Sequence, residues 1–167
     1  MPSGPRRSGA PKNPKTCHER ALGLLAVRPR SRRELERRLL AASFDRSEVD
    51  DVLTRLERVG LVDDEAFAKQ MAEYQYGSRR AGRRAVAGAL MEKGIAPDVI
   101  ASVLDETADD EEDRALALAT TRASRFSSID PVKAFQRLTG LLMRRGYSPD
   151  VARRAARRAL ALDEGDD

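Results

Sequence analysis

The sequence predicts an all-α fold: an elongated array of three tandem, helix-turn-helix-like three-helix modules behind a disordered N-terminal tail. Three observations in the 167 residues predict it. Apolar residues recur at steps of three and four, the valine-rich alternation typical of strands is missing, and glycine or polar breaks follow at regular intervals. Together they indicate about nine helices of roughly 10 to 17 residues each.

Capping residues mark the helix starts in chain order. Thr16 to Glu19 and Ser31 to Glu34 fit the capping box, in which a hydroxyl and a glutamate three residues later satisfy two backbone N–H groups. Ser47 precedes an apolar run in the same way. The remaining starts are Asp63, Asp130-Pro131 and Ser148-Pro149, and the breaks are Gly60, Gly77, Gly82, Gly94 and Gly146.

An internal repeat sets the number of modules. Residues 90–99 (LMEKGIAPDV) align with residues 142–151 (LMRRGYSPDV), and residues 39–49 give a degenerate copy with one inserted residue. Apolar residues flank all three copies at helical spacing, which chance similarity between amphipathic helices explains poorly. The predicted modules are 16–61, 62–108 and 109–162. Such arrays offer a long surface rather than a deep pocket, which suits binding along an extended partner.

The net charge of the chain is positive, but the distribution of the charged residues along the sequence is more informative than the net value. Lysine and arginine number 31 against 27 acidic residues, and arginine supplies 26 of the 31, which favours a partner with phosphates or carboxylates. Residues 1–15, read as a disordered basic tail, carry +4, and the acidic tail 163–167 carries −4. The modules between them carry +2, −2 and +4. The informative feature is therefore where the arginines cluster.

Composition excludes several classes of protein. A single cysteine rules out an internal disulfide and indicates a reducing compartment. No apolar run is long enough to span a membrane, and the N-terminus lacks the apolar stretch of a secretory signal, so we expect neither feature. With 4% aromatic residues, a stacking platform for single-stranded bases is improbable.

A search for catalytic groups finds little. Cys17 and His18 are adjacent on a helix and diverge by about 100°, which suits a nucleophile pair poorly. They also lack the further ligands that a zinc site needs. The acidic run Asp109–Asp113 is typical of a solvated first helical turn, although a metal-dependent hydrolase remains a weaker alternative. We expect no enzymatic activity, no metal and no cofactor.

The basic clusters are the candidate binding residues. One surrounds the second helix of the first module, where interleaved glutamates favour an ordinary solvated face. A second lies at Arg79, Arg80, Arg83 and Arg84 and contains no acid. A third fills the end of the last module, with members Arg144, Arg145, Arg153, Arg154, Arg157 and Arg158.

The segment Gly60–Ala68, reading GLVDDEAFA, resembles the signature of the RecX regulatory proteins. The residues around Ser31–Leu35, Lys93-Gly94-Ile95 and Arg144–Tyr147 resemble motifs of the family's three modules in the same order. The resemblance covers about residues 18–160. The stretch 72–76 lacks a tryptophan that is common there, which leaves that helix's contacts open.

The resemblance implies a modulator of the RecA recombinase. Such a protein would bind RecA–DNA filaments along the helical groove, meet DNA mainly through the filament, and restrain ATP hydrolysis and strand exchange in recombination and repair. It would be a monomer without a cofactor and would not enter membranes. The alternative is a basic helical protein that binds DNA independently of RecA, because three-helix modules resemble helix-turn-helix readers.

Two groups of residues receive roles. We expect the signature and turn residues to be structural, with Gly60 stopping one helix, Asp63 capping the next and the motif setting the angle between modules. That group is Gly60, Leu61, Asp63, Asp64, Phe67, Gly94 and Gly146. The expected contacts with the partner are Arg79, Arg80, Arg83, Arg84, Lys93, Arg144 and Arg145.

Overall fold

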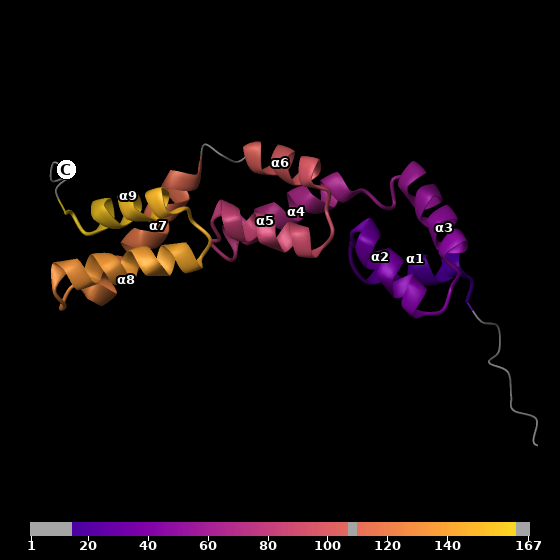
Figure 1. Ribbon diagram of the computed structural model, residues 1–167, viewed down its shortest axis with the longest axis horizontal. Helices are drawn as coiled ribbons and strands as arrows, with labels where there is room; N and C mark the ends of the chain where they lie inside the picture. Colours follow the sequence, from indigo (N-terminus) through magenta and orange to yellow (C-terminus); the bar gives the residue numbers. More distant parts are fainter. Residues whose placement is uncertain (1–14, 107–109, 163–167) are drawn as a thin grey trace, which may run out of the picture. The chain divides into compact units, whose positions relative to one another are not determined.

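The computed structural model describes residues 15–106 and 110–162, and these form nine α-helices, one 3₁₀ turn and no strand (Figure 1). The all-α prediction is confirmed. Most of both predicted tails, and Asp109 of the acidic run, lie outside the described residues. The helices are α1 (Cys17–Val27), α2 (Arg32–Ala41), α3 (Arg46–Arg58), α4 (Asp64–Gly77), α5 (Arg83–Glu92), α6 (Pro97–Asp105), α7 (Glu111–Ala123), α8 (Pro131–Arg144) and α9 (Pro149–Ala159), with η2 (Ser124–Phe126) after α7.

The helices pack in threes, and each group buries its own core. The chain divides into two compact units, Met1–Val62 and Asp63–Asp167. The first holds α1 to α3 around a core that includes Leu35, Leu39 and Leu53. The second holds two groups, α4 to α6 around Val86 and Leu90, and α7 to α9 around a third core of small and large apolar side chains. Each group is a three-helix domain.

The repeat is visible in the backbone. The second helix of each domain ends at a residue with positive φ, namely Ser43 (67°), Gly94 (74°) and Gly146 (92°). In each copy the next amide donates back to the carbonyl of a buried leucine five residues earlier, at 3.4, 3.2 and 3.2 Å. The degenerate copy in the first domain therefore forms the same turn, with serine in the place of glycine.

The predicted helix starts are mostly correct. The capping box at Thr16 is complete, and Asp63, Asp130 and Ser148 each cap their helix. One prediction is wrong. The third helix begins at Arg46 with Asp45 before it, because Ser47 already lies in the first turn. Ser31 accepts from the Glu34 amide, as a cap does, and the Glu34 carboxylate also binds arginines.

That carboxylate organises the first domain. Glu34 is 4% exposed and accepts hydrogen bonds from Arg28, Arg30 and Arg38. Burial alone would raise its pKa, but the bonds from Arg28 and Arg30 outweigh burial and lower it. Arg30 is itself buried and donates to the carbonyl of Leu24 at 3.1 Å. The reading of this cluster as a solvated face is therefore wrong at Arg30 and Glu34.

Candidate functional site

Two arginine clusters that are far apart in the sequence meet where α5 begins. The Gly82 amide donates to the Arg145 carbonyl at 2.8 Å, and the Arg84 amide donates to the Gly146 carbonyl at 3.0 Å. The amide of Arg83 donates to the Glu111 carboxylate at 3.0 Å. These bonds satisfy N–H groups that the start of a helix leaves without intrahelical partners. We call this contact the joint, and its arginines Arg79, Arg80, Arg83, Arg84, Arg144 and Arg145 the joint arginines.

Glycine is required on both sides of the joint. A Cβ added at Gly82 would lie 2.6 Å from the Gly146 carbonyl oxygen and closer still to the Gly146 carbonyl carbon. A Cβ added at Gly146 would lie 2.5 Å from the Ala85 amide nitrogen, and the φ of Gly146 is +92°. Gly146 therefore ends α8, as predicted, and also lets α5 approach closely. Gly94 follows the end of α5 and has a φ of +74°.

Three of the joint arginines use their side chains within the chain. Arg83 donates to the Leu104 carbonyl and to the Asp105 carboxylate, both at 2.6 Å. Arg145 donates to the Arg79 carbonyl at 2.7 Å. Arg80, which has a φ of +49°, donates to the Thr121 hydroxyl at 3.2 Å. These three side chains help to build the surface they belong to.

The other three joint arginines point into solvent. Arg79, Arg84 and Arg144 are exposed, and their side chains form no hydrogen bond or ion pair with residues 15–106 or 110–162. Lys93, the remaining predicted contact, caps the opposite end of α5 and does not join this cluster. The joint thus presents three unengaged guanidinium groups beside three engaged ones.

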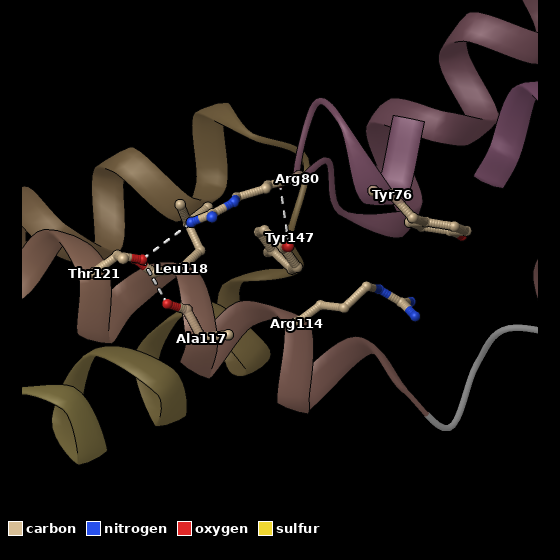
Figure 2. A pocket seen from close by; sticks show the side chains of 8 residues that line it. Tyr76, Arg80, Arg114, Ala117, Leu118, Thr121 and Tyr147 are labelled. Carbon is tan, nitrogen blue, oxygen red and sulfur yellow. Dashed lines mark hydrogen bonds between the residues drawn. The ribbon is translucent and has the colours of Figure 1, made fainter. Parts of the chain in front are cut away.

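A cleft of about 400 Å³ adjoins the joint. Figure 2 shows Arg80 and Arg114 extending in opposite directions, Arg80 toward Thr121 and Arg114 toward Tyr76. The Arg114 guanidinium lies 4.1 Å from the centre of the Tyr76 ring, a cation–π contact. Among the residues that the structure describes, none with a carboxylate lines the cleft; those that do are Tyr76, Gly77, Arg80, Arg114, Ala117, Leu118, Thr121 and Tyr147.

Tyr147 lines the cleft and holds the backbone of Arg80 in place. Its side chain is fully buried, and its hydroxyl donates to the Arg80 carbonyl at 3.2 Å. Burial raises its pKa, and the positive charge of Arg114 only partly offsets this. The phenol therefore keeps its proton and its hydrogen bond. The sequence indicated Tyr147 only as part of a repeat, and nothing local in it pointed to Tyr76, Arg114 or Thr121 as neighbours.

The signature residues lie where α3 ends and α4 begins. Gly60 has a φ of +75°, and Asp63 accepts from the Ala66 amide at 2.9 Å, so the predicted stop and cap are confirmed. Phe67 is half-buried against the second core. Leu61 is exposed, and Asp64 is the first residue of α4. That the signature residues together set the angle between modules stays a prediction.

The residues considered for catalysis have structural surroundings. Cys17 is fully buried, and burial, with a smaller effect of the Glu48 charge, raises its pKa. Glu111 binds the joint, and Glu112 pairs with Arg154 at 2.5 Å. Within the described residues, no group of three acidic, histidine or cysteine side chains is placed to hold a metal ion, and no helix is long and apolar enough to cross a membrane.

Comparison with known proteins finds the same family in three consecutive segments between residues 17 and 156. The first, second and third three-helix domains of RecX match residues 17–56, 63–104 and 109–156. A "Regulatory protein RecX" of Mycobacterium sp. (strain JLS) is 39% identical over 155 residues, which cover 90% of this chain and 85% of that protein. The Streptomyces coelicolor protein of the same name is 39% identical over 149 residues, covering 87% and 78%.

A solved structure has the same fold. The crystal structure of RecX from Lactobacillus salivarius superposes with a TM-score of 0.81 and covers 88% of this chain and 96% of that one. Its sequence is 20% identical to this chain, so the likeness shows the fold alone.

Proposed function

This chain belongs to the RecX family, and we propose that it binds filaments of the RecA recombinase on DNA and inhibits their ATP hydrolysis and strand exchange. It acts as a cytoplasmic monomer, without catalysis or a cofactor of its own, in recombination and repair. Its relatives are named regulatory proteins, which agrees with this role. The observation that carries the proposal is the gathering of the joint arginines in a chain with three RecX domains.

The charge of the joint fits a nucleoprotein filament. A filament exposes phosphates on its DNA and carboxylates on its protein, and a guanidinium group binds either one through paired hydrogen bonds. Arg79, Arg84 and Arg144 have no internal partner among the described residues, so binding need not break an existing ion pair. Contacts along the groove would require the joint to keep its shape, which Gly82 and Gly146 permit.

The test is a titration of RecA's DNA-dependent ATPase. Wild-type protein should slow hydrolysis at less than one copy per RecA. Replacing Arg79, Arg84 and Arg144 by alanine should weaken inhibition about 10-fold or more, since each charged contact that binding buries contributes on the order of 1 kcal/mol or more. This triple variant leaves intact every hydrogen bond described for the joint, so its fold should be unchanged.

A matched control removes the same charge elsewhere. Arg20, Arg55 and Arg58 are exposed arginines of α1 and α3 without an ion pair in the described part of the chain. Their triple alanine variant should inhibit as wild type does. Equal loss in both variants would show that only net charge matters, and the joint would then be the wrong contact. No inhibition by wild-type protein over a full titration would refute the proposed function itself.

A second candidate function, RecA-independent DNA binding, is favoured by the outer face of α8. Lys133, Arg137 and Arg144 are exposed and stand at positions i, i+4 and i+11, on one side of the helix. They form a line of cations suited to phosphates. Three phosphate contacts predict that log K falls against log salt with a slope of about −2 to −3. Binding that needs RecA, or that survives high salt, would exclude this candidate.

A further inference from the structure

The cleft beside the joint has the composition of a protein-docking pocket. Of the lining residues within 15–106 and 110–162, two are tyrosines and two are arginines, and none is lysine, aspartate or glutamate. Tyrosine and arginine are enriched at the residues that dominate binding between proteins, whereas lysine and acidic residues are depleted there. Its volume of about 400 Å³ is within the range of sites that enclose a side chain or small ligand.

The two cations of the cleft are held in place before any partner arrives. Arg80 donates to the Thr121 hydroxyl, which in turn donates to the Ala117 carbonyl at 2.6 Å (Figure 2). Arg114 is stacked on Tyr76 and lies 3.7 Å from the Asp110 carboxylate. Ordering a long side chain costs binding free energy, so groups fixed in advance bind more tightly. Arg80, held by a neutral hydroxyl and forming no ion pair within residues 15–106 and 110–162, is the cation placed for an anion.

The apolar residues that line the cleft indicate which kind of anion fits. Ala117, Leu118 and the tyrosine rings give the cleft carbon surfaces between its two guanidinium groups. A phosphodiester backbone has no apolar part to bury there, and Tyr76 already carries Arg114 on one ring face, which leaves little room for base stacking. A carboxylate side chain next to an apolar side chain satisfies both the Arg80 guanidinium group and the carbon surfaces of the cleft.

We infer that this cleft docks an acidic side chain, with a neighbouring apolar one, from the protein component of the partner. The inference rests on the proposed function, in which that component is RecA within the filament. It assigns the protein contact to the cleft beside Arg80, while Arg79, Arg84 and Arg144 are available for other contacts.

The test fills the cleft without changing any charge. Ala117 is exposed on α7, so Ala117→Leu should place its side chain in the cleft and leave the core untouched. Its matched control is Ala101→Leu, the same change at an exposed alanine of α6 that does not line the cleft. Binding is measured on immobilised RecA–single-stranded DNA filaments and on the bare oligonucleotide.

Ala117→Leu should bind filaments roughly 10-fold to 30-fold more weakly than wild type, as expected for a blocked hot spot. Its binding to bare DNA and its melting temperature should be unchanged, and Ala101→Leu should match wild type throughout. Should Ala117→Leu fail to fold, Arg80→Gln removes one cation of the site and should give the same selective loss.

Three outcomes would overturn the inference in distinguishable ways. If both cleft variants bind filaments as wild type does, the cleft is not a contact, and the proposed function stands. If they lose bare DNA and filament binding equally, the cleft serves nucleic acid instead of protein. If wild-type protein does not bind filaments at all, the proposed function falls and the inference falls with it.

Discussion

Replacing Gly82 by alanine should open the joint. Gly82 has an ordinary φ of −85°, so alanine meets no backbone strain there, and the effect must come from crowding alone. The new Cβ would lie 2.6 Å from the Gly146 carbonyl oxygen and closer to the Gly146 carbonyl carbon. Ordinary contact begins at 3.4 Å, so backbone on one side must retreat by about 1 Å. Backbone atoms, unlike the end of a flexible side chain, cannot do this without moving their helix.

The cost follows from the bonds that such a shift breaks. The Gly82 and Arg84 amides bond the Arg145 and Gly146 carbonyls at 2.8 and 3.0 Å. A hydrogen bond contributes about 1 kcal/mol net, and a buried donor left unsatisfied costs about 1 to 3 kcal/mol. For the two bonds together, we expect the free energy of unfolding of the Asp63–Asp167 unit to fall by about 2 to 4 kcal/mol.

Urea unfolding followed by circular dichroism measures this change, and the chain contains its own control. Gly88 lies inside α5, the helix that Gly82 caps at its N-terminus. A Cβ added at Gly88 would meet nothing within 4 Å. Gly88→Ala should therefore stabilise the protein by about 0.5 to 1 kcal/mol, the difference between glycine and alanine in a helix. Opposite signs for two identical substitutions are the expected result. A Gly82→Ala protein as stable as wild type would refute the close approach described for the joint.

Three further predictions concern the first domain. Glu34→Gln should lower the free energy of unfolding by about 3 to 5 kcal/mol in a urea titration, because it leaves Arg30 buried without its charge partner. Since the folded-state pKa of Glu34 is lowered, its stabilisation is complete above the ordinary carboxyl pKa and is lost as pH falls through the lower folded value. As pH falls through this range, the free energy of unfolding of wild type should decrease and approach that of Glu34→Gln. A constant difference between the two proteins at every pH would contradict this. Ser43→Gly should stabilise the domain by about 1 kcal/mol, because Ser43 has a φ of 67°, and an unchanged urea midpoint would argue against strain at the turn. Cys17 should react with a thiol reagent only after unfolding, because burial shields it and raises its pKa, and rapid labelling of native protein would disprove that.

Local signals in the sequence predicted the fold well. A cap such as Asp63, or a helix stop such as Gly94, depends on residues three to five positions away, so its pattern is readable without the rest of the chain. The repeat was also readable, down to the copy in which Ser43 replaces glycine. The prediction that Ser47 caps α3 was wrong because two local patterns compete at this point. Asp45 is the N-cap residue, and the helix begins directly after it at Arg46.

The candidate site depends on contacts that no local pattern encodes. The bonds that join Arg83 to Glu111, Arg80 to Thr121 and Tyr147 to Arg80 span 28, 41 and 67 residues. The sequence showed an arginine cluster without acids at 79–84, and it could not show that Asp105 would pair with Arg83 at 2.6 Å.

The contrast between engaged and unengaged arginines decides how the site must be tested. A variant that removed Arg79, Arg80, Arg83 and Arg84 together would take away two unengaged charges and also the bonds that Arg80 and Arg83 make. A loss of RecA inhibition in that variant would have two explanations, a missing contact or a loosened α5. Arg79, Arg84 and Arg144 separate the two, since none of their side chains bonds the described part of the chain. If the joint arginines bind a partner, these three must carry a measurable share of the affinity while the melting temperature stays constant.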